Sequence, residues 1–302
     1  MTAGLFPDPA PSPEPRKPPA PRPAGERRLF LIDGTAMAYR AYHAMGRSRL
    51  TDPEGRPTGA IYGFTSSLFH LLRTEAPDHL AVCFDPPGPT FRHERYADYK
   101  ATREKMPDDL VPQMPRVREV VVALGYPVLE LPGWEADDVL VTVARRAARE
   151  GARVFLVTGD KDLFQAVDDR VSIWSLNTRG APQAEVFDPK GVEAKFGVPP
   201  HQVADVLALM GDASDNVPGV RGIGPKTAVE LVRRFGGLEQ VLARAAEVEK
   251  KAVREALQRD ADSARLSYEL VKIPDDAPVE FSFEDAAVGP PDPARVGPLF
   301  ES

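Results

Sequence analysis

Short apolar runs that end at an acidic residue recur along the chain. The runs are residues 28–32 before Asp33, residues 79–84 before Asp85, and residues 153–158 before Gly159 and Asp160. Each run has the length of a β-strand, is stopped by Gly or Pro, and is followed by helix-like sequence. Strands that alternate with helices predict an α/β fold with a mostly parallel, twisted sheet flanked by helices and buried on both faces.

The acids that follow these runs are expected to converge. In a parallel sheet all carboxyl ends lie at one edge, and ligands bind there beside the switch in strand order. A fourth group, Glu135, Asp137 and Asp138, opens an apolar-periodic helical pattern that continues to Ala147. Acids are favoured in the first turn of any helix, but three acids within four residues exceed what a cap needs.

Nine carboxylates form the candidate metal site that the sequence indicates. They are Asp33, Asp85, Glu135, Asp137, Asp138, Asp160, Asp162, Asp212 and Asp215. Carboxylates packed closely repel one another unless a hard cation neutralises them. All-oxygen ligands predict Mg²⁺, with Mn²⁺ as a substitute. Taken singly, the segments around Asp33, Asp160 and Asp212 are also explained as ordinary polar turns.

Composition and charge refine this picture. The chain has 302 residues, of which 42% are hydrophobic, enough for two domains or one large one. Nine of its 32 prolines lie in residues 7–23, so residues 1–27 are expected to be a disordered tail. The single cysteine, Cys83, lies in a predicted strand as a small buried residue and excludes an intramolecular disulfide. No apolar stretch is long enough to span a membrane, and a cytoplasmic location is expected.

Two segments are candidates for contact with nucleic acid, although the net charge is −7. If the nine acids of the candidate metal site are left out, the net charge changes from −7 to +2. The balance of charges within each segment therefore matters more than the net charge of the whole chain. Residues 91–105 alternate basic residues with Tyr96 and Tyr99, which suits phosphate contact and base stacking, or equally a solvated helix face. Residues 217–226 form a glycine-rich turn between two helical patterns, which suits phosphate binding or packing alone.

The order of these motifs resembles the 5′-nuclease domain of bacterial DNA polymerase I, which belongs to the flap endonuclease family. The resemblance extends over about residues 28 to 290. It rests on the runs Leu31-Ile32-Asp33-Gly34, Phe91-Arg92-His93-Glu94-Arg95-Tyr96, Tyr99-Lys100-Ala101-Thr102-Arg103, Gly133-Trp134-Glu135-Ala136-Asp137-Asp138, Thr158-Gly159-Asp160-Lys161-Asp162, Gly211-Asp212-Ala213-Ser214-Asp215-Asn216-Val217-Pro218-Gly219 and Gly222-Ile223-Gly224.

The resemblance implies a two-metal 5′-flap endonuclease and 5′→3′ exonuclease. Its partners would be DNA with a 5′ flap, nicked or gapped duplex, and RNA primers on DNA, in replication and repair. Six acids are expected nearest the two ions, namely Asp33, Asp85, Glu135, Asp137, Asp160 and Asp162. Asp138, Asp212 and Asp215 are expected to hold metal-bound water or the outer site.

The same resemblance suggests how DNA is held. Residues 86–110 resemble a helical arch that passes the flapped strand, with Lys100 and Arg103 aimed at the scissile phosphate and acting with Asp137 in catalysis. Gly222 to Lys226 resemble a helix–hairpin–helix turn, which often holds K⁺. The DNA contacts implied or expected are Tyr39, Arg40, Arg92, Tyr99, Arg221, Gly222, Gly224 and Lys226.

The predicted organisation is a tail (1–27), an α/β nuclease core (28–200) and a helical DNA-binding region (201–302), as a monomer without an indicated recruiting protein. A free-standing nuclease and a domain excised from a polymerase both fit a chain that ends at Ser302. A catalytically silent DNA-junction binder is the alternative function. A strand-end aspartate phosphatase is a further rival class, but its nucleophile motif needs an Asp where Thr35 stands.

Overall fold

The computed structural model describes residues 25–46, 48, 50–175 and 184–301. The tail predicted at residues 1–27 lies almost entirely outside the described residues. The strands are β1 (Arg28–Asp33), β2 (His79–Cys83), β3 (Val128–Leu129), β4 (Arg153–Val157), β5 (Val171–Ser175) and β6 (Glu185–Phe187). The α-helices are α1 (Gly34–Met45), α2 (Gly59–Glu75), α3 (Phe91–Arg95), α4 (Gln113–Ala123), α5 (Ala136–Arg149), α6 (Pro189–Phe196), α7 (Val203–Met210), α8 (Pro225–Phe235), α9 (Leu238–Ala243), α10 (Lys251–Arg259), α11 (Ala261–Val271) and α12 (Pro293–Glu301). Short 3-10 helices are η1 (Asp162–Ala166), η2 (Pro200–Gln202) and η3 (Ala245–Glu247).

The strands form one six-stranded sheet in the order β3-β2-β1-β4-β5-β6. All neighbouring pairs are parallel except β5 with β6. The three strands predicted from the apolar runs are confirmed as β1, β2 and β4, and β1 pairs with both of the others. The chain therefore switches direction across the sheet beside β1, and the acids that follow the three strands meet at that edge.

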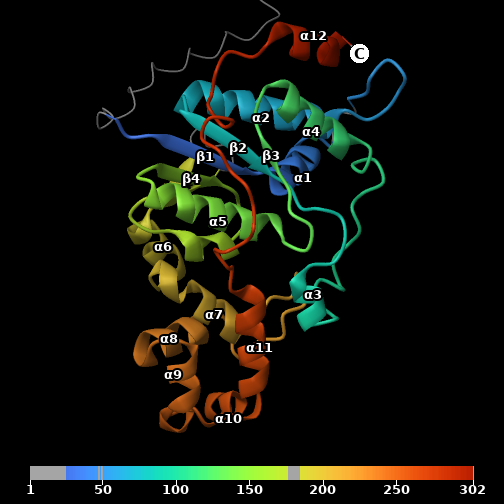
Figure 1. Cartoon of the computed structure of the whole chain (residues 1–302). Coiled ribbons are helices and arrows are strands. Elements are labelled where there is room, and N and C mark those ends of the chain that lie inside the picture. Colours follow the sequence, from blue (N-terminus) through green and yellow to red (C-terminus); the bar gives the residue numbers. More distant parts are fainter. Residues whose placement is uncertain (1–24, 47, 49, 176–183, 302) are drawn as a thin grey trace, which may run out of the picture.

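Helices cover both faces of the sheet, as the sequence predicts (Figure 1). Leu29 and Leu31 of β1 belong to the core that includes α5, whereas Phe30 and Ile32 belong to the core that includes α1, α2 and α4. Side chains along a strand alternate between faces, so this division follows from the continuous apolar run. Cys83 is fully buried in the α5 core, as expected for a small apolar residue.

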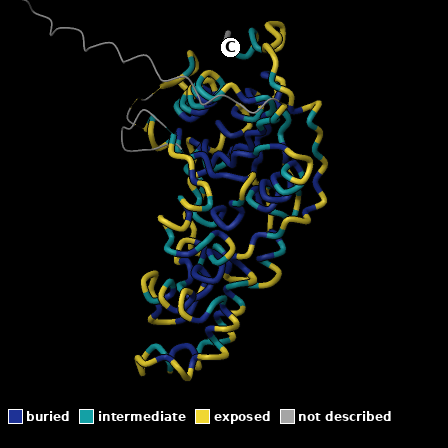
Figure 2. Tube along the Cα trace, turned by 90° about the vertical axis from the view of Figure 1, so that its left-hand side faces the viewer, coloured by how far each residue is buried: buried dark blue, intermediate teal, exposed yellow. Residues whose placement is uncertain are grey.

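The C-terminal helices extend from the sheet and share its core (Figure 2). One continuous cluster of buried residues joins β1 and α5 to α7, α8 and α11. Helix α7 packs against α8 and α11, and α7 and α8 are the two helices predicted on either side of the glycine-rich turn. Among the helices of the described residues, none combines the length and apolar composition that a bilayer crossing requires.

Residues 86–110 contain less helix than the resemblance implies. Their only helix among the described residues is α3, and turns occupy much of the remainder. Backbone groups in this segment bond to other parts of the chain instead, since Lys100 N donates to Asp215 O at 2.9 Å. Lys100 also has a φ of +58°, outside the right-handed helical region. The segment therefore crosses the acidic edge as an ordered but mainly non-helical arm.

Candidate active site

The strand-end acids are held by the first turns of nearby helices. Asp33, the last residue of β1, accepts a hydrogen bond from Ala36 N at 2.8 Å and so caps α1. Asp85, just beyond β2, accepts from Ala136 N at 2.9 Å, at the start of α5. Helix N-termini favour negative charge because their first N–H groups have no partner within the helix. The two carboxylates are therefore oriented by backbone groups before any cation binds.

A second acidic group forms where two loops meet. Carboxylate oxygens of Asp162, Asp212 and Asp215 all lie within 4.8 Å of one another. Oδ1 of Asp162 is buried and has no hydrogen-bond partner. A buried carboxylate oxygen without a donor is costly unless a cation supplies the missing interaction. The all-oxygen donor set and this orphaned atom both fit a hard divalent ion.

Burial and mutual repulsion hold protons on several of these acids. Burial, followed by the charge of Asp85, raises the pKa of Asp33 to about 7. Burial and the charge of Asp160 raise the pKa of Asp162 to about 7 and also raise the pKa of Asp137. Asp160 thus acts on members of both acidic groups, which makes the two groups one continuous electrostatic site.

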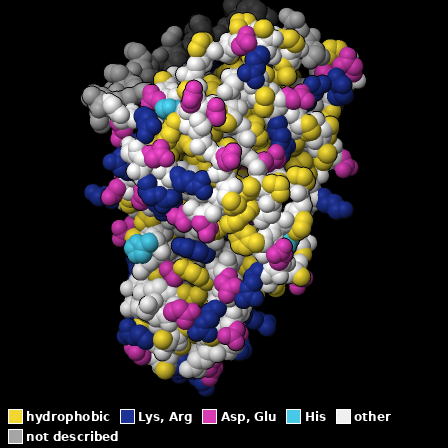
Figure 3. Space-filling model, in the orientation of Figure 1, with side chains coloured by type: hydrophobic (Ala, Val, Ile, Leu, Met, Phe, Trp, Pro, Cys, Tyr) yellow, Lys and Arg dark blue, Asp and Glu magenta, His cyan; other side chains and the backbone are white. Residues whose placement is uncertain are grey.

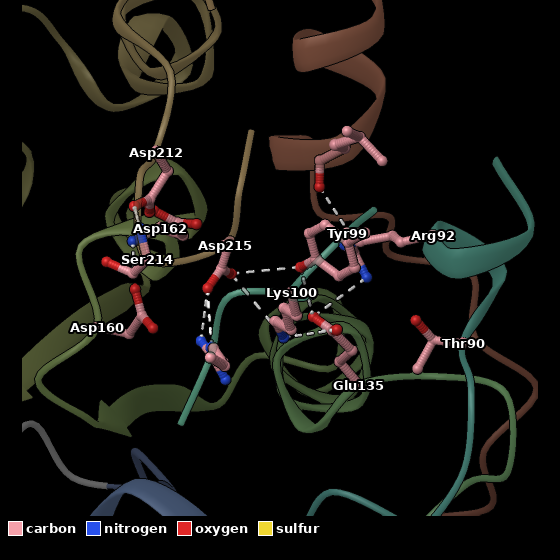
Figure 4. Close-up of polar contacts among 12 residues, drawn as sticks. Thr90, Arg92, Tyr99, Lys100, Glu135, Asp160, Asp162, Asp212, Ser214 and Asp215 are labelled. Carbon is pink, nitrogen blue, oxygen red and sulfur yellow. Dashed lines mark hydrogen bonds and ion pairs between the residues drawn. The ribbon is translucent and has the colours of Figure 1, made fainter. Parts of the chain in front are cut away.

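Lys100 of the 86–110 arm points toward Glu135 (Figure 4), and Arg103 of the same arm bonds to Asp215. Lys100 Nζ lies 2.6 Å from Glu135 Oε1 and 3.9 Å from Asp215 Oδ2. Arg103 donates to Asp215 Oδ1 through Nε at 2.9 Å. Burial alone would raise the pKa of Glu135, but the charges of Lys100 and Arg92 outweigh it and lower that pKa. The predicted catalytic residues Lys100 and Arg103 therefore lie against Glu135 and Asp215, and the charge of Glu135 also acts on Asp137.

Arg92 and Asp138 do not take the roles expected from the sequence. Arg92 is only 2% exposed, and Asp138 is fully buried. The guanidinium donates to both oxygens of Asp138, at 2.7 and 2.8 Å, and Asp138 Oδ2 also accepts from Glu135 N at 3.0 Å. In this arrangement Arg92 cannot reach DNA and Asp138 has both oxygens engaged, so a buried ion pair replaces the predicted DNA contact and outer metal role.

Tyr99 is buried, whereas the predicted DNA contacts Tyr39 and Arg40 are partly exposed. Tyr99 is 4% exposed, and its hydroxyl lies 3.2 Å from Glu135 Oε2 and 3.4 Å from Asp215 Oδ2. A buried ring cannot stack on a base, so the predicted DNA contact of Tyr99 is also corrected. Tyr39 and Arg40 on α1 are half-buried, and the charges of Arg103 and Asp85 act on Tyr39. Their contacts with DNA stay predictions.

The glycine-rich turn is open to solvent. Arg221, Gly222 and Gly224 are exposed between α7 and α8, and Lys226 is exposed in the first turn of α8. Gly222 has a φ of +91°, a conformation that favours glycine, and no atom lies near the position of an added Cβ. A ligand backbone could therefore approach the turn closely. Figure 3 shows basic and acidic side chains interspersed over this face of the molecule, without a large area of one sign.

Sequence reasoning missed three polar residues that organise the acids. Thr158 Oγ1 lies 3.1 Å from Asp33 Oδ2 and accepts from Asp160 N. Lys161 Nζ pairs with Asp212 at 2.7 Å, and its position between two predicted ligands was the available signal. Gln165 bonds to backbone groups more than 100 residues away, for which no local signal exists.

Two family models together match residues 28–294 of the chain. The model for the 5′-3′ exonuclease N-terminal resolvase-like domain matches residues 28–197, and that for the 5′-3′ exonuclease C-terminal SAM fold matches residues 198–294. A 5′-3′ exonuclease of Aquifex aeolicus is 41% identical over 266 residues, 88% of both chains. DNA polymerase I of Bacillus caldotenax is 42% identical over 276 residues, which cover 91% of this chain but 31% of the polymerase.

Solved structures share the fold. The T5 D15 protein co-crystallised with metal ions has a TM-score of 0.70 and 22% identity, covering 82% of this chain and 90% of its own. The catalytic core of Rad2 in complex with DNA has a TM-score of 0.61 and 17% identity, covering 91% and 87%. At these identities the likeness supports the arrangement of sheet and helices.

Divalent ions should stabilise the protein more at pH 8 than at about pH 5.5. The pKa values of Asp33 and Asp162 are near 3.8 in the unfolded chain and about 7 in the folded chain. Between these values the folded chain binds more protons, so the metal-free protein loses stability as the pH rises. An ion that neutralises the acids removes this loss. We expect the rise in Tm with Mn²⁺ to be roughly twice as large at pH 8.

Asp162→Asn is the matched variant for this measurement. It removes one repelling charge, so its metal-free Tm at pH 8 should exceed that of the wild type, and its gain from Mn²⁺ should shrink. Equal gains at the two pH values in the wild type would contradict the repulsion argument.

Arg92→Ala should strongly destabilise the fold. The variant leaves Asp138 buried without its counter-charge, which costs about 3–5 kcal/mol in the free energy of unfolding. Arg95→Ala is the control, because Arg95 pairs with Glu269 on the surface and should contribute less than about 1 kcal/mol. Urea unfolding measures both, and similar losses in the two variants would refute the structural role of Arg92.

Proposed function

Because this chain belongs to the 5′-3′ exonuclease family, we propose that it hydrolyses DNA phosphodiesters at junctions of single and double strand. It acts as a 5′-flap endonuclease and 5′→3′ exonuclease. The convergence of acids from separate segments, two of which pair with Lys100 and Arg103, is the observation that carries this proposal. The chain spans about a third of the DNA polymerase I relatives, so activities of their other parts are not attributed to it.

Two Mg²⁺ ions are the proposed cofactors, with Mn²⁺ as a substitute. One would be held by acids that follow β1, β2 and β4 together with Asp137, and the other by Asp162, Asp212 and Asp215. Two such ions supply Lewis acidity at the phosphate and lower the pKa of water for attack. The unpartnered oxygen of Asp162 supports this assignment, because a cation would supply its missing interaction. Burial and the charges of neighbouring acids raise the pKa of Asp137, and a bound cation would offset both effects.

Lys100 and Arg103 are proposed to bind the scissile phosphate. Their ammonium and guanidinium groups now neutralise Glu135 and Asp215 at the mouth of the acidic site. Arg103 is half exposed, so its side chain can turn toward a ligand without breaking the core. Positive charge placed there stabilises the pentacoordinate phosphate, whose oxygens carry most charge in the transition state.

The exposed turn at Gly222 and Gly224 is proposed to grip the uncut duplex. Its open backbone N–H groups and the nearby Arg221 and Lys226 suit phosphate contact without sequence readout. A K⁺ ion held by carbonyls of this turn belongs to the same proposal. The arm of residues 86–110, with Tyr39 and Arg40 beside it, would guide the single strand.

Flapped, nicked and gapped duplexes and RNA primers on DNA are the proposed substrates. A monomer in the cytoplasm is the proposed working form, serving replication and repair. A silent junction binder would keep the turn and the arm, but it has no need for a cluster of buried carboxylates. No observation favours that alternative.

The direct test is a labelled 5′-flap DNA incubated with the protein in Mg²⁺ or in EDTA. Release of the flap only in Mg²⁺ supports the proposal. Binding of the flap in both buffers without cleavage would instead support the silent binder, and hydrolysis confined to small phosphate monoesters would support a phosphatase.

Asp137→Ala should abolish cleavage and leave DNA binding measurable. The carboxylate is proposed to hold an ion, and losing metal stabilisation of the transition state should reduce the rate about 10³-fold or more. Asp285→Ala is the control, since Asp285 is an exposed acid far along the chain from the site. Full activity of Asp137→Ala would overturn the assignment of this residue.

Lys100→Ala should slow the chemical step far more than it weakens binding. A lost electrostatic contact at the transition state typically reduces the rate about 10²- to 10³-fold. Single-turnover cleavage and the Kd for flap DNA separate the two effects, with Lys190→Ala on the exposed side of α6 as control. An unchanged single-turnover rate would reject the role of Lys100.

A further inference from the structure

Two buried side chains from the nuclease core hold the C-terminal end of α11. Arg92 Nε donates to Leu270 O at 2.8 Å, and Gln165 Nε2 donates to Val271 O at 2.9 Å. Gln165 Oε1 also accepts from Ile273 N at 3.1 Å. The last carbonyls of a helix have no partner within it, so these two side chains complete the end of α11.

The same side chains also touch the segments that carry the acids. Arg92 binds both oxygens of Asp138 and lies 3.5 Å from Glu135 Oε2. Gln165 Nε2 donates to the backbone oxygen of Asp162 at 3.0 Å. One end of α11 is thus bonded to an element of each acidic group.

The first seven residues of α11 hold the loop that leads into the exposed turn. Ser263 Oγ donates to Gly219 O at 2.8 Å, and Gly219 N donates to Ser267 Oγ at 2.9 Å. Arg221 N donates to Asp260, the residue that precedes α11, at 3.1 Å. Gly219 packs closely against the end of α7, because an added Cβ there would lie 2.4 Å from Gly211 N. Seven helical steps, ~10 Å, separate Ser263 from Leu270, where the contacts with the nuclease core begin.

We propose that α11 is the spacer that sets which phosphodiester is cut, with Gln165 at its C-terminal end and Ser263 near its N-terminal end as positioning residues. This inference rests on the proposed function. If the turn grips the duplex, its distance from the acids fixes how far from the junction the chain is cut. Hydrogen bonds at each end of a stiff helix hold that distance, whereas apolar packing against α7 alone permits small sliding shifts.

Loss of this spacing should change the position of the cut and leave DNA binding largely intact. A displacement of about 1 Å can reduce the rate of an aligned reaction about 100-fold. A shifted spacer also presents neighbouring phosphodiesters to the acids. Loss of either anchor should therefore spread the cuts over adjacent positions, which a residue that only stabilises the fold would not do.

The test uses Gln165→Met, which keeps side-chain length but removes the polar atoms, and Ser263→Ala near the opposite end of α11. The control is Gln258→Ala, because Gln258 is exposed on α10. Each full-length variant is first checked for folding by its Tm. Single-turnover cleavage of an end-labelled flap DNA, resolved to one nucleotide, then gives the rate and the distribution of cuts.

We expect both variants to bind flap DNA within about twofold of the wild type, to cut ~10- to 100-fold more slowly, and to spread cuts to neighbouring positions. The double variant should show little further spread, since both changes release one spacer. Sharp cuts at the wild-type position in a folded variant at either end of α11 would overturn the inference alone. A wild-type chain that leaves every flap intact would overturn the proposed function and this inference with it.

Discussion

Repulsion among carboxylates at one edge of the sheet is the constraint on which the rest of this structure depends. Parallel strands deliver Asp33, Asp85 and Asp160 to the same edge, and α5 adds Asp137 beside them. Buried like charges raise one another's pKa values, as seen at Asp33 and Asp137. A fold that gathers so many acids must supply positive charge, either from its own side chains or from bound cations.

The protein's own side chains neutralise some of these acids and leave others without a positive partner. Arg92 satisfies Asp138 completely within the core, while Lys100 and Arg103 reach Glu135 and Asp215 from a solvent-facing arm. Asp162 keeps a buried oxygen without any partner. The division separates a permanent structural ion pair from contacts that a phosphate or a divalent ion can replace. The proposed metal and phosphate sites therefore lie where the protein's own basic side chains do not fully neutralise the acids.

Local pattern was enough to predict the centre of the fold and the acids around it. The runs that became β1, β2 and β4 are long and apolar, whereas β3 has two residues and β6 three, too short for a pattern. Charge pattern could not separate Arg92 from Lys100, because burial is decided by Asp138 and by α11, which come from distant parts of the chain. Gln165 was missed for the same reason, since its backbone partners at Val271 and Ile273 are distant in sequence.

The central claim is that acids from separate segments jointly hold two divalent ions. Crystals soaked in Mn²⁺ and measured for anomalous scattering test it most directly. The account predicts two anomalous peaks, one beside Asp33, Asp85 and Asp137 and one among Asp162, Asp212 and Asp215. Crystals that show these carboxylates ordered but no anomalous peak among them would contradict it.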